Sequence, residues 1–385
     1  MRRKKIAIFA ERLYGGGVER ILQTVVRNLD YSKYDVIIYS SHPEKIDSSF
    51  YPQNLKSTSY FSSCVADATP LRKFITKVVN KIRIFVYYHC SANIFYRLFI
   101  CKKYDVVIAF LEGYATRIAS GAHKNTKKIA WLHTDIINYH WTTVAFRNSG
   151  EEKACYQKFS EIICVAESVK SQADKYINRE SNSMVIYNPI DKERLLELAH
   201  ENADDAKGLK KHKIQLLIVG TLNKNKGQLR LLHIMARLLK NNSDIGLWIV
   251  GDGEYHNLIQ ETIEELQLKD YVTMLGYQNN PYPFFQKCDI YVCASHAEGF
   301  NTAITEALIL GKPVVATLCS GVEEQLGRNC EYGIIANNDD ESLYRCIERM
   351  LIPANLAHYR EKSKERGRLF SISESMKKID DLLQK

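Results

Sequence analysis

The segment Asp289–Thr317 reads DIYVCASHAEGFNTAITEALILGKPVVAT, and it contains one complete strand–loop–helix–strand unit. Its first residues, Asp289–Ala294, form an apolar run rich in β-branched and aromatic side chains, as in a buried strand. Asn301 is a good N-cap for a helix over Thr302–Leu310, and Pro313–Thr317 predicts the next strand. Two strands joined through a helix pair in parallel, so this unit predicts a parallel sheet.

Similar apolar runs, each followed by a helical pattern, recur along the whole chain. In the first half they are Lys5–Ala10, Tyr34–Ser40, Tyr104–Phe110, Lys127–His133, Glu161–Ala166 and Ser183–Tyr187. In the second half they are Ile214–Gly220, Gly246–Gly251, Tyr271–Leu275, Asp289–Ala294, Pro313–Thr317 and Tyr332–Ala336. This alternation predicts an α/β fold with helices on both sheet faces. Two such series in 385 residues predict two Rossmann-like, doubly wound domains.

The boundary between the domains is expected at Asn188–Asp191, because Pro189 ends a strand and Asp191 can cap the following helix. The first domain is therefore predicted over residues 1–190 and the second over residues 191–370. A polar stretch, Glu201–Lys213, predicts a surface connection inside the second domain. Residues 371–385 have the periodicity of an amphipathic closing helix, expected to pack toward the first domain.

The composition is that of a globular protein, with 45% hydrophobic and 25% charged residues. The net charge of +9 would suit nucleic acid, an anionic lipid surface or phosphorylated small molecules, and charge alone cannot choose among them. Several of the ten cysteines, such as Cys164, Cys288, Cys293 and Cys319, lie in or beside apolar runs without any CxxC pair. We therefore predict buried free thiols and no metal site.

The N-terminus begins with a basic cluster and an apolar run, but the run stops at Glu11 and is too short for a signal peptide. It predicts a first strand, and we expect a cytoplasmic protein. The stretch Arg72–Phe99 mixes basic, aromatic and apolar residues, and Arg83, His89 and Arg97 interrupt its apolar part. Two interpretations stay open: contact with the headgroup layer at the inner face of the cell membrane, or a helix pair that packs on its own domain.

Two acids in the opening segment, Glu298 and Glu306, lie on either side of a tight turn at Gly299 and a capped helix. Either acid alone would be an ordinary surface residue, but together they favour a ligand site at the carboxyl edge of the sheet. Glu306 can accept the hydroxyls of a ribose, and Glu298 would meet another part of the ligand. The backbone N–H groups of Asn301, Thr302 and Ala303 are expected to be unpaired and to suit a phosphate.

A second candidate site is Val219–Gly227, which directly follows the first strand of the second domain. Lys224 and Lys226 in this glycine-bearing turn can hold phosphate oxygens as point charges. The GxxxxGK[ST] order of a P-loop is absent. This turn should open on the same sheet edge as the strand that ends near Ser295.

Two further motifs lie in the first domain. In Tyr14–Arg20 the glycines, including Gly16 and Gly17, allow the backbone to approach a ligand at a helix N-terminus, although the GxGxxG order is absent. Trp131–Asp135 places His133 at a strand end. A lone histidine is usually structural, but this one lies at the edge where ligands of such folds bind.

Taken in order, these landmarks resemble family four of the retaining glycosyltransferases, which contains many bacterial polysaccharide and lipopolysaccharide enzymes. The run from Glu298 to Glu306 resembles the E-x7-E motif of that family, and Gly311-Lys-Pro-Val-Val follows it. The other matching segments are Gly15–Arg20, Asn188–Pro189, Gly220–Gly227, Gly251–Gly253 and Ser320–Glu324. The resemblance covers nearly the whole chain. It implies the GT-B architecture, with two Rossmann-like domains facing across a cleft, and a reaction that needs no metal or other cofactor.

The resemblance also implies roles for individual residues of the second domain. Glu306 would bind the ribose, Glu298 the hydroxyls of the donor sugar, and Lys226 the phosphates. The sugar and phosphate would also meet backbone N–H groups of Phe300, Asn301 and Thr302.

Gly220 belongs to the same turn, and there the sequence departs from the family. Members usually carry arginine after this glycine, but Thr221 stands here, so a planar bidentate donor is missing. Lys224 is the candidate to compensate. In the first domain, Gly16 and Gly17 would approach the diphosphate, and His133 would face the sugar or acceptor.

The function that follows is transfer of a hexose or N-acetylhexosamine from a nucleotide sugar, with UDP as the commonest nucleotide. The acceptor would be a growing lipid-linked glycan of capsule, exopolysaccharide or lipopolysaccharide, and the anomeric configuration would be retained. The alternatives are a nucleotide-sugar epimerase of the same fold, or a basic membrane- or nucleic-acid-binding module. The sequence shows no recognition helix or RNA-stacking motif, and we expect no nucleic-acid partner.

Overall fold

The computed structural model describes residues 2–61, 69–178, 182–201, 209, 212–241 and 244–385. The chain divides into two compact units. Unit 1 comprises Met1–Pro189 and Ser373–Lys385, and unit 2 comprises Ile190–Ile372. Most of the polar stretch Glu201–Lys213 lies outside the described residues, so its predicted role as a surface connection stays a prediction.

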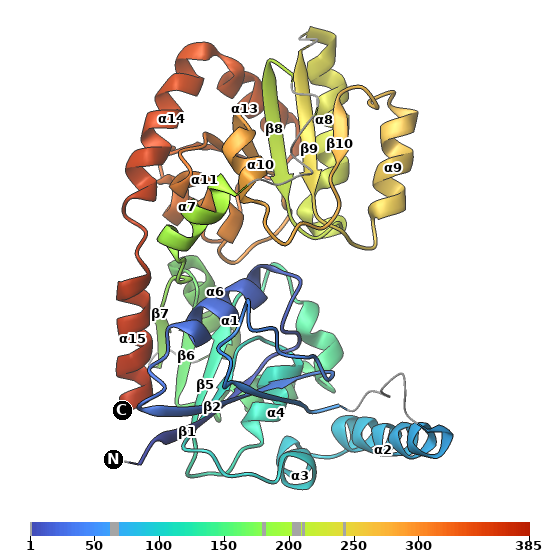
Figure 1. The fold of residues 1–385 in the computed structure, drawn as a ribbon, viewed down its shortest axis with the longest axis vertical. Coiled ribbons are helices and arrows are strands. Elements are labelled where there is room, and N and C mark those ends of the chain that lie inside the picture. Colours follow the sequence, from blue (N-terminus) through green and yellow to red (C-terminus); the bar gives the residue numbers. More distant parts are fainter. Residues whose placement is uncertain (1, 62–68, 179–181, 202–208, 210–211, 242–243) are drawn as a thin grey trace. The chain divides into compact units, whose positions relative to one another are not determined.

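Unit 1 is built on a parallel sheet of seven strands in the order β3-β2-β1-β4-β5-β6-β7 (Figure 1). Its strands are β1 (Lys4–Phe9), β2 (Tyr34–Ser40), β3 (Lys56–Ser59), β4 (Val106–Ala109), β5 (Lys127–Leu132), β6 (Glu161–Cys164) and β7 (Ser183–Val185). Its helices are α1 (Gly17–Arg27), α2 (Pro70–His89), α3 (Ala92–Phe95), η1 (Tyr96–Ile100), α4 (Tyr114–Ser120), η2 (Trp141–Ala145), α5 (Ser149–Tyr156), α6 (Glu167–Ile177) and α15 (Ile372–Gln384).

The closing helix α15 is bound to the strands of unit 1 by polar contacts. The Nζ of Lys4 donates to the carbonyl of Leu383 at 3.0 Å, and the hydroxyl of Tyr34 donates to Asp380 at 2.6 Å. The last helix of the chain thus belongs to the first unit.

Unit 2 contains a parallel sheet of six strands in the order β10-β9-β8-β11-β12-β13. The strands are β8 (Ile214–Val219), β9 (Ile245–Val250), β10 (Val272–Met274), β11 (Ile290–Cys293), β12 (Val314–Thr317) and β13 (Ile334–Ala336). The helices are α7 (Lys192–His200), η4 (Lys224–Lys226), α8 (Gln228–Asn241), α9 (His256–Glu265), α10 (Tyr282–Lys287), α11 (Thr302–Ile309), α12 (Val322–Leu326), α13 (Asp340–Leu351) and α14 (Pro353–Gly367).

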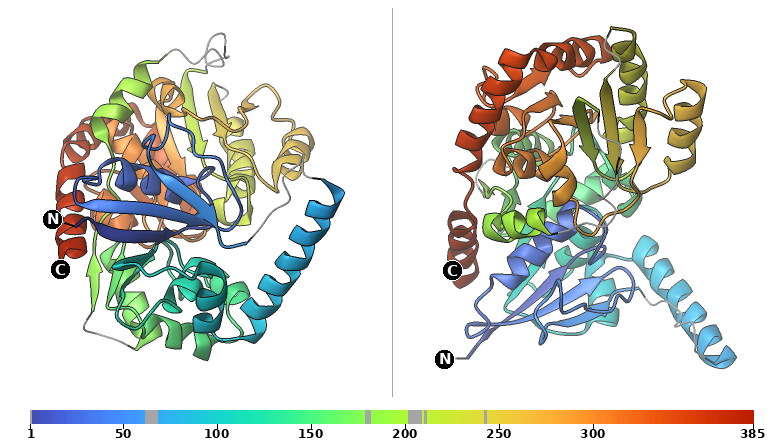
Figure 2. Two further views of the ribbon diagram at one scale, coloured as in Figure 1. Left: turned by 60° about the horizontal axis from the view of Figure 1, so that its bottom comes forward. Right: turned by 45° about the horizontal axis from the view of Figure 1, so that its top comes forward.

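Successive residues of β8 contribute to two different cores. Leu216 packs in a cluster with Leu231 and Leu232 of α8, whereas Leu217 packs in a second cluster with Ile304 of α11. Because neighbouring strand residues point to opposite faces, helices cover both sides of this sheet, as Figure 2 also shows. Two Rossmann-like α/β domains are therefore confirmed.

Each strand predicted from the sequence is present, and one further strand was not predicted. That strand, β3, has the polar sequence Lys-Ser-Thr-Ser and pairs with β2 at the edge of the sheet formed by the described residues. An edge strand needs no continuous apolar run because one of its sides is not paired, so the apolar signal was missing. The described cysteines are free thiols, with Cys164, Cys288 and Cys293 buried and Cys319 half-buried.

The turn between β8 and α8 depends on Gly227. Its φ is +71°, and a Cβ atom added there would lie 2.0 Å from the carbonyl oxygen of Ala294 at the end of β11. The missing side chain therefore allows the start of α8 to approach the neighbouring strand end.

We expect Gly227→Ala to destabilise unit 2 by about 3 kcal/mol, because left-handed strain adds to a backbone clash. Gly276→Ala is the matched control, since its φ is +66° and nothing lies within 4 Å of an added Cβ. It should cost about 1 kcal/mol, from strain alone. Urea denaturation of both variants measures the difference, and equal losses would contradict the close approach.

Candidate functional site

The order of strands in unit 2 reverses between β8 and β11, which are neighbours in the sheet although β9 and β10 lie between them in sequence. At such a switch point the loops after the two strands diverge and leave room for a ligand. Asn225, in the loop after β8, ties the two loops together. Its carbonyl accepts from His296 N–H at 2.7 Å, and its side-chain amide donates to the Ala297 carbonyl at 2.9 Å.

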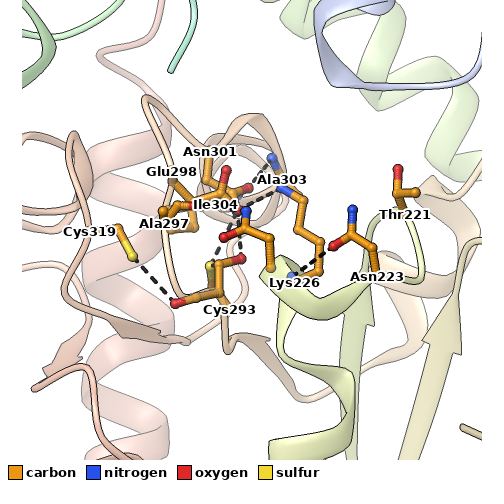
Figure 3. Close-up of polar contacts among 12 residues, drawn as sticks. Thr221, Asn223, Lys226, Cys293, Ala297, Glu298, Asn301, Ala303, Ile304 and Cys319 are labelled. Atoms are coloured by element: carbon orange, nitrogen blue, oxygen red, sulfur yellow. Dashed lines mark hydrogen bonds and ion pairs between the residues drawn. The ribbon is translucent and has the colours of Figure 1, made fainter. Parts of the chain in front are cut away.

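Lys226 and Glu298 meet across this switch point (Figure 3). The Nζ of Lys226 lies 2.6 Å from Oε1 of Glu298. The same oxygen accepts from Ser295 Oγ at 2.6 Å and from Asn301 Nδ2 at 3.0 Å. Among the described residues no hydrogen bond reaches Oε2, so the carboxylate is held by one oxygen and can offer the other to a ligand.

The ion pair is partly buried, with the Lys226 side chain 27% exposed and that of Glu298 11% exposed. Burial opposes the charge on Lys226, but the adjacent Glu298 carboxylate outweighs this effect and raises the lysine pKa. The lysine therefore stays cationic at any physiological pH. An ammonium group has three N–H donors, so Lys226 can bind a second anion while it contacts Glu298.

Asn301 begins helix α11 as predicted. Its side chain accepts from the N–H groups of Ala303 at 3.0 Å and Ile304 at 3.3 Å. The expectation that the N–H of Ala303 is unpaired is therefore wrong, because the cap that starts the helix uses that donor. The hydrogen bonds found in the described part of the chain include none from the N–H groups of Asn301 or Thr302.

The loop before α11 is fixed from a neighbouring segment. Gly321 has a φ of +77°, and a Cβ atom on it would lie 2.4 Å from the carbonyl oxygen of Gly299. Gln325 donates to the carbonyl of Asn301 at 2.7 Å. Phe300 is buried within this loop. The helix N-terminus is thus held by packing and hydrogen bonds before any ligand binds.

Glu306 lies one turn into α11 and is buried. The hydroxyl of Tyr282, on α10, donates to its Oε1 at 3.1 Å. Tyr282 was not among the predicted site residues, although it lies in the loop–helix segment that follows β10. Glu298 and Glu306 therefore belong to one helix–loop unit but have different partners, so they can contact different parts of a ligand.

The turn after β8 also contains the predicted site residues Gly220, Thr221 and Lys224. Thr221 is exposed and lies apart from the Lys226–Glu298 cluster in Figure 3. Gly220 and Lys224 lie in the same turn, and Lys224 is exposed. Arg230 lies nearby, but its guanidinium is bonded to Asp340 and Asn338, each at 2.8 Å, so it supports the loop and does not replace the missing arginine.

In unit 1, Gly16 and Gly17 form the start of α1 as expected. The carboxylate of Glu19 accepts from the backbone N–H of Gly16, and a Cβ on Gly16 would lie 2.6 Å from Glu19 Oε2. Burial raises the pKa of Glu19. A phosphate at this helix end would have to share or displace that carboxylate.

His133 is buried at the end of β5, and its Nε2 has no hydrogen-bond partner among the residues that the structure describes. Burial lowers its pKa to about 3, so the imidazole is neutral. Its backbone N–H and that of Thr134 donate to the buried carboxylate of Glu112, at 3.2 and 2.6 Å. A neutral imidazole here can form a hydrogen bond to a hydroxyl but does not supply a positive charge.

The strand order of unit 1 reverses between β1 and β4. Glu11 follows β1, and Glu112 follows β4, so the two acids lie at this switch point. Neither acid was selected from the sequence, although Glu11 directly follows one predicted strand and Glu112 lies two residues after another. Burial and then the charge of Glu112 raise the pKa of Glu11 to about 7, and its Oε1 has no hydrogen-bond partner within the described part of the chain.

Ionisation of Glu11 should therefore destabilise unit 1 as the pH rises from about 4.5 to about 7. Glu11→Gln removes this cost, so its melting temperature should exceed that of the unmodified chain at pH 8 but not at pH 5. The gain should be about 1–2 kcal/mol, after allowance for partial exposure. Glu193→Gln, at an exposed site on α7, is the control. A gain that is equal at both pH values would contradict the raised pKa.

Comparison with known proteins gives a consistent result for both halves of the chain. Residues 15–194 match the family described as Glycosyltransferase Family 4, and residues 200–369 match the family described as Glycosyl transferases group 1. Together the two matches cover most of the sequence.

Among curated proteins, the chain is 34% identical over 189 residues to an N-acetylgalactosamine-N,N'-diacetylbacillosaminyl-diphospho-undecaprenol 4-alpha-N-acetylgalactosaminyltransferase of Campylobacter jejuni. That match covers 48% of this chain and 49% of the relative. The chain is also 29% identical over 153 residues to a lipopolysaccharide core biosynthesis glycosyltransferase of Rhizobium meliloti, which covers 40% of this chain and 43% of the relative. The matched region thus spans about half the length of these relatives.

Solved structures share the fold over the full length. A complex of Anabaena HepE with UDP-glucose has a TM-score of 0.77 at 18% identity and covers 99% of this chain and 100% of that one. A complex of S. aureus TarM that contains UDP has a TM-score of 0.71 at 14% identity, covering 99% and 100%.

Proposed function

Since the chain belongs to the group 1 and family 4 glycosyltransferases, we propose that it transfers a hexose or N-acetylhexosamine from a UDP-linked donor. The acceptor is a hydroxyl of a growing lipid-linked surface glycan, and the anomeric configuration is retained. The single observation that carries the proposal is the Lys226–Glu298 pair at the switch point of unit 2. It combines a cation for phosphate with a carboxylate that has one oxygen free of hydrogen bonds within the described residues.

The parts of a nucleotide sugar fit the parts of this site. Glu306 accepts hydrogen bonds from the ribose hydroxyls, and Oε2 of Glu298 accepts hydrogen bonds from hydroxyls of the sugar. The N-terminus of α11 and Lys226 bind the diphosphate. The UDP and UDP-glucose in the structural neighbours support a UDP donor. The name of the Campylobacter relative, which acts on a diphospho-undecaprenol glycan, supports a lipid-linked acceptor.

In the reaction, the bond between the anomeric carbon and the diphosphate oxygen breaks, and a bond to the acceptor oxygen forms on the same face. The acceptor proton passes to the departing phosphate. Negative charge grows on the leaving diphosphate, where Lys226 and the amides that begin α11 stabilise it most strongly. Neutral His133 in unit 1 is a hydrogen-bonding group for the sugar or acceptor.

Replacement of Lys226, at the diphosphate, and replacement of Glu306, at the ribose, should have different kinetic effects. Lys226→Ala should lower kcat about 100-fold, because the lysine acts on charge that develops in the transition state. Glu306→Ala should mainly raise KM for the donor, about tenfold or more, because ribose contacts are already made in the ground state. A screen of UDP-sugars for hydrolysis or binding first identifies the donor. Steady-state kinetics with that donor then measure kcat and KM of each variant.

Lys240→Ala on α8 and Glu265→Ala on α9 are matched controls at exposed positions of the same unit, and both should behave as the unmodified chain. Normal transfer by Lys226→Ala and Glu306→Ala would defeat the site assignment. Isomerisation of the nucleotide sugar without any acceptor would instead identify an epimerase.

Thr221 offers a second test of the diphosphate site. Thr221→Arg should lower the Kd for UDP about tenfold, because a guanidinium adds bidentate phosphate contacts and the position is exposed. Calorimetric titration with UDP measures the change. An unchanged or weaker affinity would mean that this turn does not reach the diphosphate.

A further inference from the structure

Helix α2 exposes large apolar side chains along most of its length. The strongly exposed ones are Leu71, Phe74, Ile75, Val78, Ile82, Ile84 and Phe85. In Figures 1 and 2 the helix extends away from the sheet of unit 1. A helix normally buries such residues against its own domain, so this exposure points to an external partner.

Most of these side chains lie on one side of the helix. At about 100° per residue, positions seven apart lie nearly above one another, as Leu71, Val78 and Phe85 do. The remaining members flank that line, except Ile84, which lies elsewhere. We define the α2 stripe as Leu71, Phe74, Ile75, Val78, Ile82 and Phe85.

The contacts that fasten α2 to its unit lie on the opposite side. Tyr87 is buried, and its hydroxyl donates to the carbonyl of Ala145 at 2.7 Å. The guanidinium of Arg117 stacks over the Tyr87 ring at 4.2 Å and pairs with Glu151 at 2.7 Å. Because Tyr87 is two positions beyond Phe85, about 200° around the helix, this anchor turns the α2 stripe outward.

The charge of this region has one sign. Residues 70–104 contain no aspartate or glutamate, whereas α2 alone carries Arg72, Lys73, Lys77, Lys81 and Arg83. Lys77 and Lys81 lie along one edge of the α2 stripe, on the side of Phe74, and neither forms an ion pair with any described residue. An apolar stripe bordered by lysines is the pattern of a helix that lies in a headgroup layer.

We propose that the α2 stripe binds an anionic lipid surface, with its apolar side chains inserted among the headgroups and Lys77 and Lys81 against the phosphates. Charge complementarity selects this occupant over a second copy of the chain, because two copies of a face without acids would repel each other. Within the described ranges, no helix combines the length and apolar content needed to span a bilayer. This binding goes beyond the proposed transfer reaction and does not depend on it.

The test is co-sedimentation of the full chain with phosphatidylcholine vesicles that contain phosphatidylglycerol, beside vesicles of phosphatidylcholine alone. The chain should pellet with the anionic vesicles, and added salt should release it. Phe74→Ser with Phe85→Ser should lower the partition coefficient about tenfold or more, since two aromatic insertions are lost. Lys77→Glu with Lys81→Glu should also lower it about tenfold or more.

The controls match these changes elsewhere on the surface. Leu369→Ser alters a side chain that is 64% exposed, as Phe74 is, and Lys175→Glu with Lys240→Glu reverses two exposed lysines outside α2. Both controls should partition like the unmodified chain, and circular dichroism checks that every variant folds.

Two results would overturn the proposal. One is an unmodified chain that stays in the supernatant with anionic vesicles at low salt, or α2 variants that bind as well as it does. The other is self-association in sedimentation velocity that the Phe74 and Phe85 changes abolish while vesicle binding is absent. That second result would make the α2 stripe an interface between copies.

Discussion

The reversal of strand order between β8 and β11 is the constraint on which the candidate site depends. It brings the ends of two strands distant in sequence side by side, and the ion pair between Lys226 and Glu298 joins their loops at 2.6 Å. The pairing leaves the lysine charged and the carboxylate held by one oxygen. Gly227 and Gly321 serve the same arrangement, because only residues without a Cβ allow these close backbone approaches. The result is a preorganised cation beside a helix N-terminus, which suits a diphosphate.

The switch point of unit 1 has the opposite character. It carries Glu11 and Glu112 instead of a lysine, and a neutral imidazole in place of a cation. Such groups form hydrogen bonds with hydroxyl groups but carry no positive charge that would attract phosphate. The same topology thus presents an edge with a cation in unit 2 and an edge with buried acids and a neutral imidazole in unit 1.

Much of the fold followed from the sequence because its strands are buried on both faces and therefore appear as apolar runs. Strand β3 was not predicted because it is polar and lies at an edge. The cap of α11 was predicted because Asn301 directly precedes an apolar helix. The predicted residues Lys226 and Glu298 form an ion pair, but this contact depends on the tertiary fold and cannot be predicted from their spacing along the chain. Sequence patterns showed that Ala303 lies near a helix start but not that Asn301 would use its N–H. Likewise, basic and apolar residues in α2 were visible, whereas which face is exposed depends on the anchor at Tyr87.

A crystal structure of the chain with UDP bound would show whether the nucleotide occupies the β8–β11 switch point. We expect the ribose hydroxyls to lie against Glu306 and the diphosphate to lie between Lys226 and the N-terminus of α11. A nucleotide bound instead at the Gly15–Gly17 turn of unit 1, or away from the β8–β11 switch point, would contradict this expectation.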